Sequence, residues 1–280
     1  ESGEDPASDF PARRAAPYRA YYEHMPMRAS ALQGALSGLA SGGALRMHGR
    51  VQIGGLATIH LLDDRQYRSP QACPAPGRGG SRRIDPAACM EWADPARSLL
   101  GFEQERWLEE GLAAHGRTQG WNLIAQQTLL GRRDFRPGGG VAVWSDAWDG
   151  YPEARKRLKQ AIARQGVENL VVLGGDVHEN WVGHVLADDE RPGSASLGVE
   201  FCGTSISSRS SNARVAEQLA ENPHFVFADA VRKGYGLHEL TREHLHTRLR
   251  VVDDVTRPDA GIETLASFTV KAGRPVIERI

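Results

Sequence analysis

The sequence lacks any apolar run long enough to cross a membrane, because a spanning helix needs roughly 18 to 20 consecutive apolar residues. The opening stretch ESGEDPASDFPARR holds no apolar segment of the kind found in a signal peptide. A dominant charge is also lacking, since the net charge is −1 at pH 7 and the isoelectric point is near 6.9. We therefore expect no membrane span, no nucleic-acid-binding surface and no signal segment in the chain as given.

Cysteine is scarce, with three residues in 280. Cys73 and Cys89 lie in one loop rich in proline, glycine and arginine, where a disulfide would stabilise the fold by about 3 kcal/mol through chain entropy. Two free thiols are an equally good interpretation. Cys202, in GVEFCG, is expected to be a buried strand residue. The sequence has no zinc-type cysteine spacing and no G-x-S-x-G motif, which disfavours zinc-finger and serine-hydrolase functions.

With 280 residues the chain is long enough for one large domain or two small ones, and 40% hydrophobic and 25% charged residues are ordinary for a globular protein. We expect a single domain over residues 1–280. Buried-type strands alternate with helices, which is typical of an α/β layer structure. The expected strands are 55–63, 121–127 and 169–178, and the expected helices are 10–25, 102–116 and 152–166.

The last third of the sequence has a different pattern, with short alternating strands in quick succession. This pattern predicts antiparallel pairing added to a mixed sheet. Residues 69–98 form a long loop rich in proline and glycine, and loops of that length are usually functional or mobile. The expected fold class is therefore α/β, with mixed sheets and an antiparallel carboxyl-terminal portion.

The stretch VVLGGDVHENW, residues 171–181, places ionisable side chains where chemistry is expected. An apolar strand leads to Gly174 and Gly175, and Asp176 and His178 follow. In open α/β sheets the reactive groups lie beyond the carboxyl ends of the strands, and glycines there allow a sharp turn. The spacing lets a carboxylate and an imidazole converge on one cation. A capping aspartate beside a hydrogen-bonded histidine is the alternative interpretation.

A hydrolytic two-metal centre needs more ligands than two side chains supply. The sequence upstream contains no second D-x-H, no other Gly-Asp pair, and no Asn-His-Asp or Asp-His-Glu cluster. The candidate site is therefore incomplete within this sequence.

Three other polar stretches are weaker candidates. DAWDGY, residues 146–151, is interpreted mainly as helix capping and packing. DDRQYR, residues 63–68, offers arginines to an anionic substrate, although an Asp with Arg65 more often forms a structural pair at a strand end. GTSISSRSSN, residues 203–212, lacks the Gly-Lys-Ser/Thr of a P-loop and is interpreted as a loop.

Taken in order, eight stretches resemble the alkaline phosphatase D (PhoD-like) family between about Phe10 and Val270. Each stretch alone is weak, but the ordered set is specific. The stretches are AYYEHMP, LDDRQYR, LGFEQERWL, WNLIAQQ, DAWDGYPEARKRL, VVLGGDVHENW, EFCGTSISS and NPHFVFADAVRKGY.

This resemblance implies a calcineurin-like metallophosphoesterase, in which a four-layer α-β-β-α sandwich hydrolyses phosphate mono- or diesters at a metal cluster. Asp176 and His178 fall where the wider superfamily has metal ligands, so the resemblance implies metal-binding and catalytic roles for both. It also implies calcium and iron as the metals, a small phosphate ester as the substrate, and a periplasmic or extracellular location.

The resemblance further implies that the chain is the carboxyl-terminal part of such a protein, without the amino-terminal domain and the first half of the catalytic domain. Cys73, Cys89 and Cys202 do not match the family's metal-binding cysteine. Asp64 and Gly174 stand where threonine is common in the family, and neither is a proposed ligand.

The expected function is phosphate ester hydrolysis by a metal-activated water or hydroxide. In that mechanism Trp148, Tyr151 and Trp181 are candidate substrate-binding residues, with core packing as the alternative. A non-catalytic binding or scaffold module is the second hypothesis, because upstream ligands are absent. A cytoplasmic α/β hydrolase of another type is the third, and a disulfide between Cys73 and Cys89 would argue against it.

Overall fold

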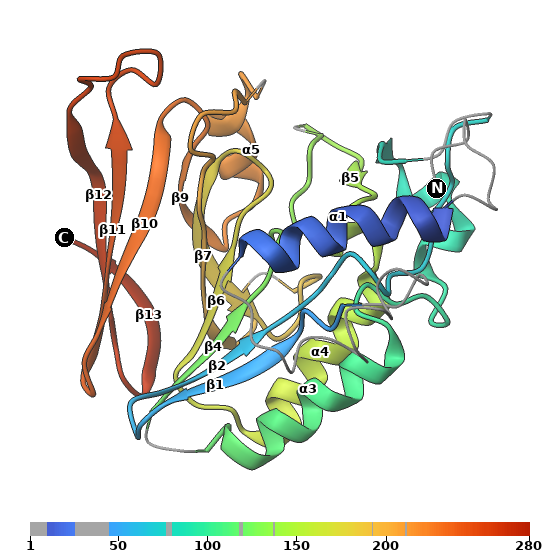
Figure 1. Ribbon diagram of the computed structural model, residues 1–280, viewed down its shortest axis with the longest axis horizontal. Coiled ribbons are helices and arrows are strands. Elements are labelled where there is room, and N and C mark those ends of the chain that lie inside the picture. Colours follow the sequence, from blue (N-terminus) through green and yellow to red (C-terminus); the bar gives the residue numbers. More distant parts are fainter. Residues whose placement is uncertain are drawn as a thin grey trace.

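The computed structural model describes residues 10–25, 45–76, 80–117, 120–136, 138–191, 193–210 and 212–280. Two β-sheets pack face to face, and two helices cover the outer face of the larger sheet (Figure 1). The chain therefore forms successive layers of helix, mixed sheet and antiparallel sheet.

The larger sheet has seven strands in the order β1-β2-β4-β6-β8-β7-β9. Its four central members β2, β4, β6 and β8 run parallel, whereas β1, β7 and β9 pair antiparallel with their neighbours. The strands are β1 (Gly49–Ile53), β2 (Ala57–Leu61), β4 (Trp121–Ala125), β6 (Leu170–Gly174), β7 (Asn180–Leu186), β8 (Ser196–Cys202) and β9 (Phe225–Asp229). Leu61 pairs with Ala125, and Ala125 pairs with Leu173, so β2, β4 and β6 end at one edge.

Helices α3 (Phe102–His115) and α4 (Pro152–Gln165) connect these parallel strands and cover one face of the sheet. Leu108, Leu112, Leu158 and Ile162 share a buried cluster with strand residues such as Val172. Each such leucine or isoleucine contributes roughly 1.5 to 3 kcal/mol by leaving water. This apolar face, more than helix propensity, holds the two helices in place.

The ends of α4 follow the signals in the sequence. Pro152 occupies the first turn, where its missing N–H removes no hydrogen bond. Gly166 follows the last turn with φ +60° and donates its N–H to carbonyls of that turn.

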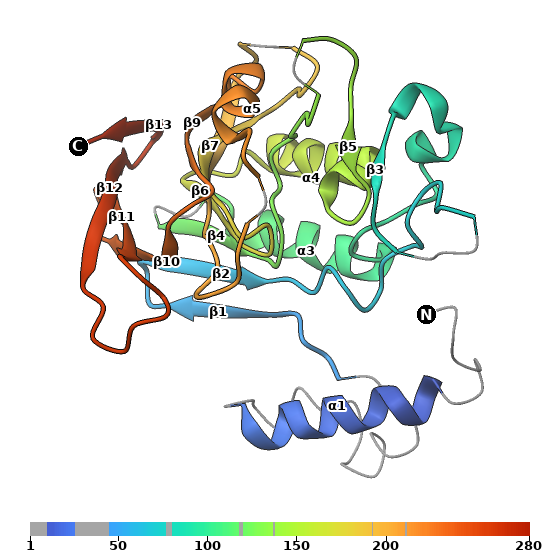
Figure 2. The same ribbon diagram turned by 90° about the horizontal axis from the view of Figure 1, so that it is seen from above.

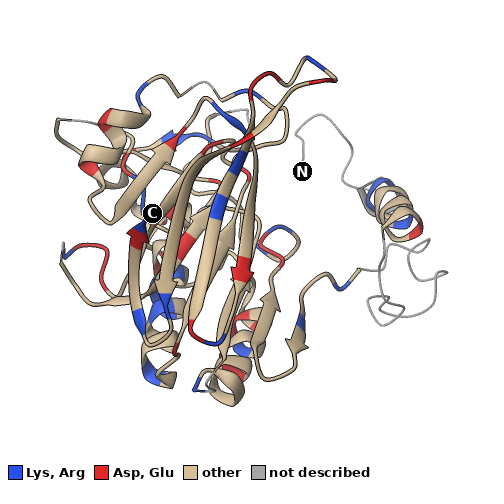
Figure 3. Cartoon of the chain, turned by 90° about the vertical axis from the view of Figure 1, so that its left-hand side faces the viewer, with Lys and Arg blue, Asp and Glu red and all other residues tan. Residues whose placement is uncertain are grey.

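The smaller sheet is antiparallel, in the order β10-β11-β12-β13. Its strands are β10 (Lys233–Leu240), β11 (His244–Val252), β12 (Ile262–Lys271) and β13 (Arg274–Arg279). Its inner face packs Leu245, Leu249 and Phe268 against Val171 and Phe201 of the larger sheet. Its strands carry charged residues of both signs (Figure 3), and the ion pair between Arg248 and Glu239 joins β11 to β10.

Residues 69–98 form a segment with its own small core. It contains β3 (Arg83–Ile84) and two 3-10 turns, η3 (Pro86–Ala88) and η4 (Met90–Ala93), and β3 pairs with β5 (Val143–Trp144). The disulfide between Cys73 and Cys89 closes this segment, with Cys89 buried. Of the two interpretations of these cysteines, the bridge is the one observed.

The expected α/β class and the antiparallel carboxyl-terminal portion are present. Among the described residues, the other α-helices are α1 (Phe10–His24) and α5 (Val215–Glu221), and α1 lies beyond the β1 edge, outside the layers (Figure 2). The described part of the chain thus supplies three of the four layers of an α-β-β-α sandwich. None of its helices has the length and apolar character needed to cross a membrane.

Removal of the disulfide tests its contribution to stability. Replacing Cys73 and Cys89 by serine should lower the free energy of unfolding by about 3 kcal/mol, because the bridge closes a loop with a sequence separation of 16. Urea unfolding measures the loss. A reductant should bring the wild type to the level of the double variant and leave that variant unchanged. Equal stability of both proteins in oxidising buffer would contradict the prediction.

The buried histidine of β2 makes stability depend on pH. His60 is fully buried, and its Nδ1 accepts a hydrogen bond of 3.2 Å from Arg50. Burial, and secondarily the charge of Arg50, lowers the pKa of His60 to about 4. The native state therefore binds fewer protons than the unfolded chain between about pH 6.5 and 4, so stability present above pH 6.5 is lost as the pH falls.

The expected loss attributable to His60 is about 3 kcal/mol between pH 7 and pH 4. A His60→Gln variant should show a correspondingly flatter dependence of unfolding free energy on pH, measured by urea titrations at several pH values. His246→Gln, at an exposed position of β11, is the matched control and should follow the wild type. Parallel pH curves for wild type and His60→Gln would refute this origin of the acid sensitivity.

Candidate active site

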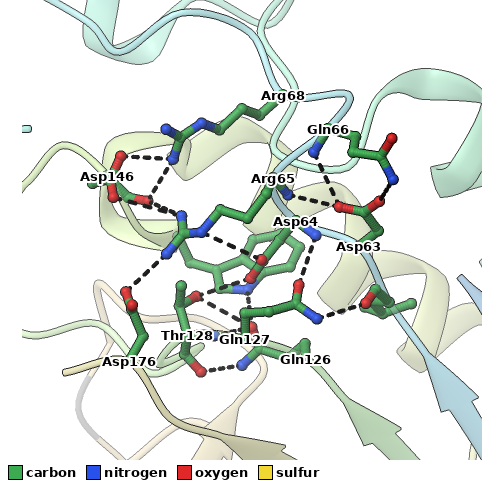
Figure 4. Close-up of polar contacts among 12 residues, drawn as sticks. Asp63, Asp64, Arg65, Gln66, Arg68, Gln126, Gln127, Thr128, Asp146 and Asp176 are labelled. Atoms are coloured by element: carbon green, nitrogen blue, oxygen red, sulfur yellow. Dashed lines mark hydrogen bonds and ion pairs between the residues drawn. The ribbon is translucent and has the colours of Figure 1, made fainter. Parts of the chain in front are cut away.

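Three segments of polar residues meet at the carboxyl edge of the parallel strands. Residues 63–65 follow β2, residues 126–128 follow β4, and residues 175–178 follow β6. Because β2, β4 and β6 are adjacent and in matched register, these segments lie together (Figure 4). This edge is where open α/β sheets bind ligands.

The turn after β2 is built by side chains that bind backbone groups. Gln104 of α3 accepts from the N–H of Asp63 at 2.8 Å and donates to its carbonyl at 2.7 Å. The carboxylate of Asp63 then accepts from the backbone N–H of Arg65 and of Gln66. Asp63 is therefore a structural residue, and the turn it makes directs Arg65 across the strand ends.

The loop after β6 has an unusual backbone. Asp176 and His178 have φ values of +68° and +60°, in the left-handed region that non-glycine residues rarely adopt. Such conformations cost about 1 to 3 kcal/mol each and cluster at functional sites. Gly174 is required just before them, because a Cβ there would lie 2.1 Å from the carbonyl oxygen of Thr128.

Neighbouring strands hold this strained loop by its backbone. The carbonyl of His178 accepts hydrogen bonds from Lys233 Nζ at 2.9 Å and from Thr204 Oγ1 at 3.1 Å. The thiol of Cys202 donates to the carbonyl of Gly175 at 3.4 Å. These contacts come from β8, β10 and the segment between β8 and α5, so the second half of the chain fixes the loop.

The structure brings Asp176 and His178 to the wall of one cavity of about 480 Å³. The side chain of Asp176 is half exposed and accepts a hydrogen bond of 2.8 Å from Arg65. The ring Nδ1 of His178 lies 3.3 Å from the carbonyl oxygen of Arg209. Arg83, Phe135 and Trp144 lie farther along the same cavity wall.

A buried ion pair supports the floor of the cavity. Arg133 and Glu179 are both nearly inaccessible and lie 2.7 Å apart. Glu179 also accepts from Trp181 Nε1 at 2.7 Å and from Ser210 Oγ at 3.0 Å. Since Glu179 follows His178 directly, this network fixes the end of the strained loop.

Asp64 is buried beneath the site, and one of its carboxylate oxygens accepts no hydrogen bond from the described residues. It is fully buried, Thr128 donates to its Oδ2 at 3.3 Å, and its Oδ1 has no hydrogen-bond partner among the described residues. Burial raises the pKa of Asp64 to about 6, although the charge of Arg65 and the hydrogen bond from Thr128 oppose that rise.

The three aromatic residues expected to bind substrate are core residues. Trp148, Tyr151 and Trp181 are each 1% exposed or less. Trp148 Nε1 donates to Gln126, and the Tyr151 hydroxyl donates to the carbonyl of Ser69. Side chains this deeply buried have no surface to offer a substrate, which agrees with the alternative of core packing.

Two stretches rated as weak contribute more than expected. Arg65 and Arg68, from DDRQYR, both pair with Asp146, from DAWDGY. Asp149, also from DAWDGY, caps no helix. It accepts from the Arg133 backbone N–H and pairs with the buried Arg155. The signal in the sequence was an arginine shortly after the end of β2. Its pairing with Asp146 could not be predicted from spacing, because the two residues are 81 positions apart.

The donor set fits part of a metal site. A carboxylate and an imidazole two residues apart, on a strained loop facing a cavity, are ligand types that many metal ions accept. Among the described residues, however, no group of three or more His, Cys, Asp or Glu side chains is arranged to hold an ion. Asp176 and His178 are therefore two candidate ligand side chains in the described part of the chain.

A mixed sheet packed on an antiparallel sheet, with ionisable loops at the carboxyl edge, defines an α/β protein with a candidate ligand site at the strand ends. A sequence model of the family described as PhoD-like phosphatase matches residues 1–249. The chain belongs to the PhoD-like phosphatase family.

Two relatives support this assignment. The protein "Alkaline phosphatase D" of Bacillus subtilis (strain 168) is 36% identical over 275 residues, which are 97% of this chain and 44% of that protein. The solved structure "Structure of PhoD" is 34% identical, with a TM-score of 0.84 over 99% of this chain and 50% of that chain. The predicted family and fold class are thereby confirmed. The chain spans half or less of the length of these relatives, and its expected place within a longer protein stays a prediction.

The buried pair beneath the loop generates a stability prediction. Arg133→Met should lower the free energy of unfolding by about 3 to 5 kcal/mol, because it leaves the Glu179 carboxylate buried without its cation. Arg132→Met is the adjacent control, since its partner Glu190 is exposed, and it should change stability by about 1 kcal/mol or less. Urea unfolding measures both, and equal losses in the two variants would contradict the distinction.

Proposed function

We propose that this chain carries part of the active site of a metal-dependent phosphohydrolase that cleaves phosphate mono- or diesters. The observation that carries the proposal is the loop after β6, where Asp176 and His178 adopt left-handed conformations at the wall of a cavity. Strain of this kind persists where the surrounding structure enforces it for a function. Membership of the PhoD-like phosphatase family supports the same chemistry.

In this proposal Asp176 and His178 are two of the metal ligands, with calcium and iron the metals implied by family resemblance. A bound ion of this kind polarises the phosphoryl oxygens and lowers the pKa of a water molecule. The chain's own contribution is geometric. Gly174 and Gly175 let β6 end in a sharp turn, and Lys233 and Thr204 hold the His178 carbonyl so that the ring stays at the cavity.

The cavity of about 480 Å³ beside the loop receives the rest of the ester. The residues that line it include the aromatic residues Phe135 and Trp144 and the basic residues Arg83 and Arg209. Such a surface accepts both the apolar and the anionic parts of an organic phosphate. Small phosphate esters are therefore the proposed substrates.

A second candidate function is that of a non-catalytic binding module. It is favoured by one observation, namely that the described residues gather no more than two metal-ligand side chains at the site. Metal analysis of the purified chain separates the two candidates. Stoichiometric tightly bound metal together with turnover would refute the binding module.

An oxidising location is also part of the proposal. The disulfide between Cys73 and Cys89 supports it, because such bridges persist outside the cytoplasm and are rare within it. This bridge argues against the third hypothesis, in which the chain is a cytoplasmic α/β hydrolase of another type.

The metal-ligand roles generate an activity prediction. Asp176→Asn and His178→Asn should each lower kcat/KM for a chromogenic phosphate ester by about 100-fold or more, since even outer-shell changes at metal sites reduce activity 10- to 100-fold. The assay uses the protein purified from its complete gene, with calcium and iron supplied. Bound metal is measured in parallel.

Asp253→Asn is the matched control, because this aspartate is exposed in the turn between β11 and β12. It should retain wild-type activity and metal content. Activity in Asp176→Asn equal to that of the control would remove the assigned role.

A further inference from the structure

The side chain of Arg65 contacts two other loops at the candidate site. Its guanidinium lies between the loops that follow β5 and β6, with Asp146 on one side and Asp176 on the other (Figure 4). Nη1 donates to the Asp146 carbonyl at 2.9 Å, and Nη2 donates to Asp176 Oδ2 at 2.8 Å. Asp64 Oδ1 lies 3.9 Å from its Nε.

This arrangement differs from the structural ion pairs of the fold. The pairs Arg133 with Glu179 and Arg155 with Asp149 are closed to solvent, because each of their side chains is at or below 8% exposure. Arg65 is 32% exposed and its partner Asp176 is 50% exposed. A guanidinium has five N–H donors, and the described residues accept hydrogen bonds from two of those on the Arg65 side chain. Donors remain for a ligand.

The two sides of the arrangement are not equivalent. The Asp146 carboxylate also accepts from Arg68 Nη1 at 2.6 Å and from Gln71 Nε2 at 2.6 Å, so it keeps a cation when Arg65 turns away. Asp176 has Arg65 as its cationic partner within the described part of the chain. The bond to Asp176 is therefore exchangeable, and the bond to the Asp146 carbonyl is the anchor.

We propose that Arg65 binds the phosphoryl group of the substrate, and that Asp146 and Arg68 position it for this role. The proposal rests on the proposed function, in which Asp176 lies next to the reacting phosphate. Once another cation neutralises Asp176, the electrostatic attraction between Arg65 and that carboxylate is weakened. Its planar fork matches two oxygens of a phosphate better than the point charge of a lysine does.

The test measures the affinity for inorganic phosphate by isothermal titration calorimetry, which does not depend on turnover. Arg65→Ala should raise the Kd about 10- to 100-fold, because it removes charge-assisted hydrogen bonds to the anion. Arg65→Lys should give an intermediate Kd, since it keeps the charge and loses the fork. The inhibition constant of phosphate should rise in the same order.

Arg164→Ala is the matched control, because Arg164 is an exposed arginine of α4 whose ion pair with Glu109 lies on the helical surface. Its Kd should stay within about twofold of the wild type. Thermal unfolding of all variants reports whether they fold, and Arg65→Lys serves if Arg65→Ala does not. Wild-type affinity in a folded Arg65 variant, or no phosphate binding by the wild type, would overturn the assignment.

The two proposals fail in different ways. An inactive Asp176→Asn variant combined with unchanged phosphate affinity in the Arg65 variants would remove only the role of Arg65. A wild type without turnover whose phosphate binding is weakened by Arg65→Ala would remove the hydrolase proposal and leave an anion site at Arg65, whereas an active Asp176→Asn variant would remove only the ligand role of Asp176.

Discussion

The close approach of the β4 and β6 strand ends is the constraint on which the candidate site depends. A side chain at Gly174 would place its Cβ 2.1 Å from the Thr128 carbonyl oxygen, so in this chain glycine permits the two loops to approach this closely. The chain bends in the residues that follow β6. Asp176 and His178 then take left-handed conformations, which tertiary contacts must hold in place. The close approach of the two strand ends and the strained residues Asp176 and His178 thus lie next to each other in the chain.

The site is enclosed by two kinds of charge pair with different physical roles. Arg133 with Glu179 is shielded from water, so breaking it would leave a charge in a medium that solvates it poorly. Arg65 with Asp176 is open to solvent, which screens the attraction and lowers the cost of separating the two groups. The closed pair keeps the loop rigid, and the open pair leaves its members available to a ligand.

The sequence predicts the elements better than it predicts the contacts between them. The sequence predicts the helix that begins at Pro152 and is capped by Gly166, because its end residues are local signals. It predicts the parallel strands because apolar runs are local signals as well. Strand β7 is not among the predicted elements, and it begins only two residues after His178. Its pairing between β8 and β9 is a long-range choice that the local pattern does not encode.

The same limit explains which site residues were found. Asp176 and His178 stand out because glycines and a buried strand precede them within a few residues. Arg65 was interpreted as a structural partner of a neighbouring Asp, yet its strong contacts come from residues 81 and 111 positions away. Trp148 is a candidate substrate-binding residue in the sequence because aromatic residues are frequent at binding surfaces. In the structure its side chain is buried in the core between the larger sheet and the helices. Whether a polar group faces a ligand or another element is decided by the packing of layers, and only the fold carries that information.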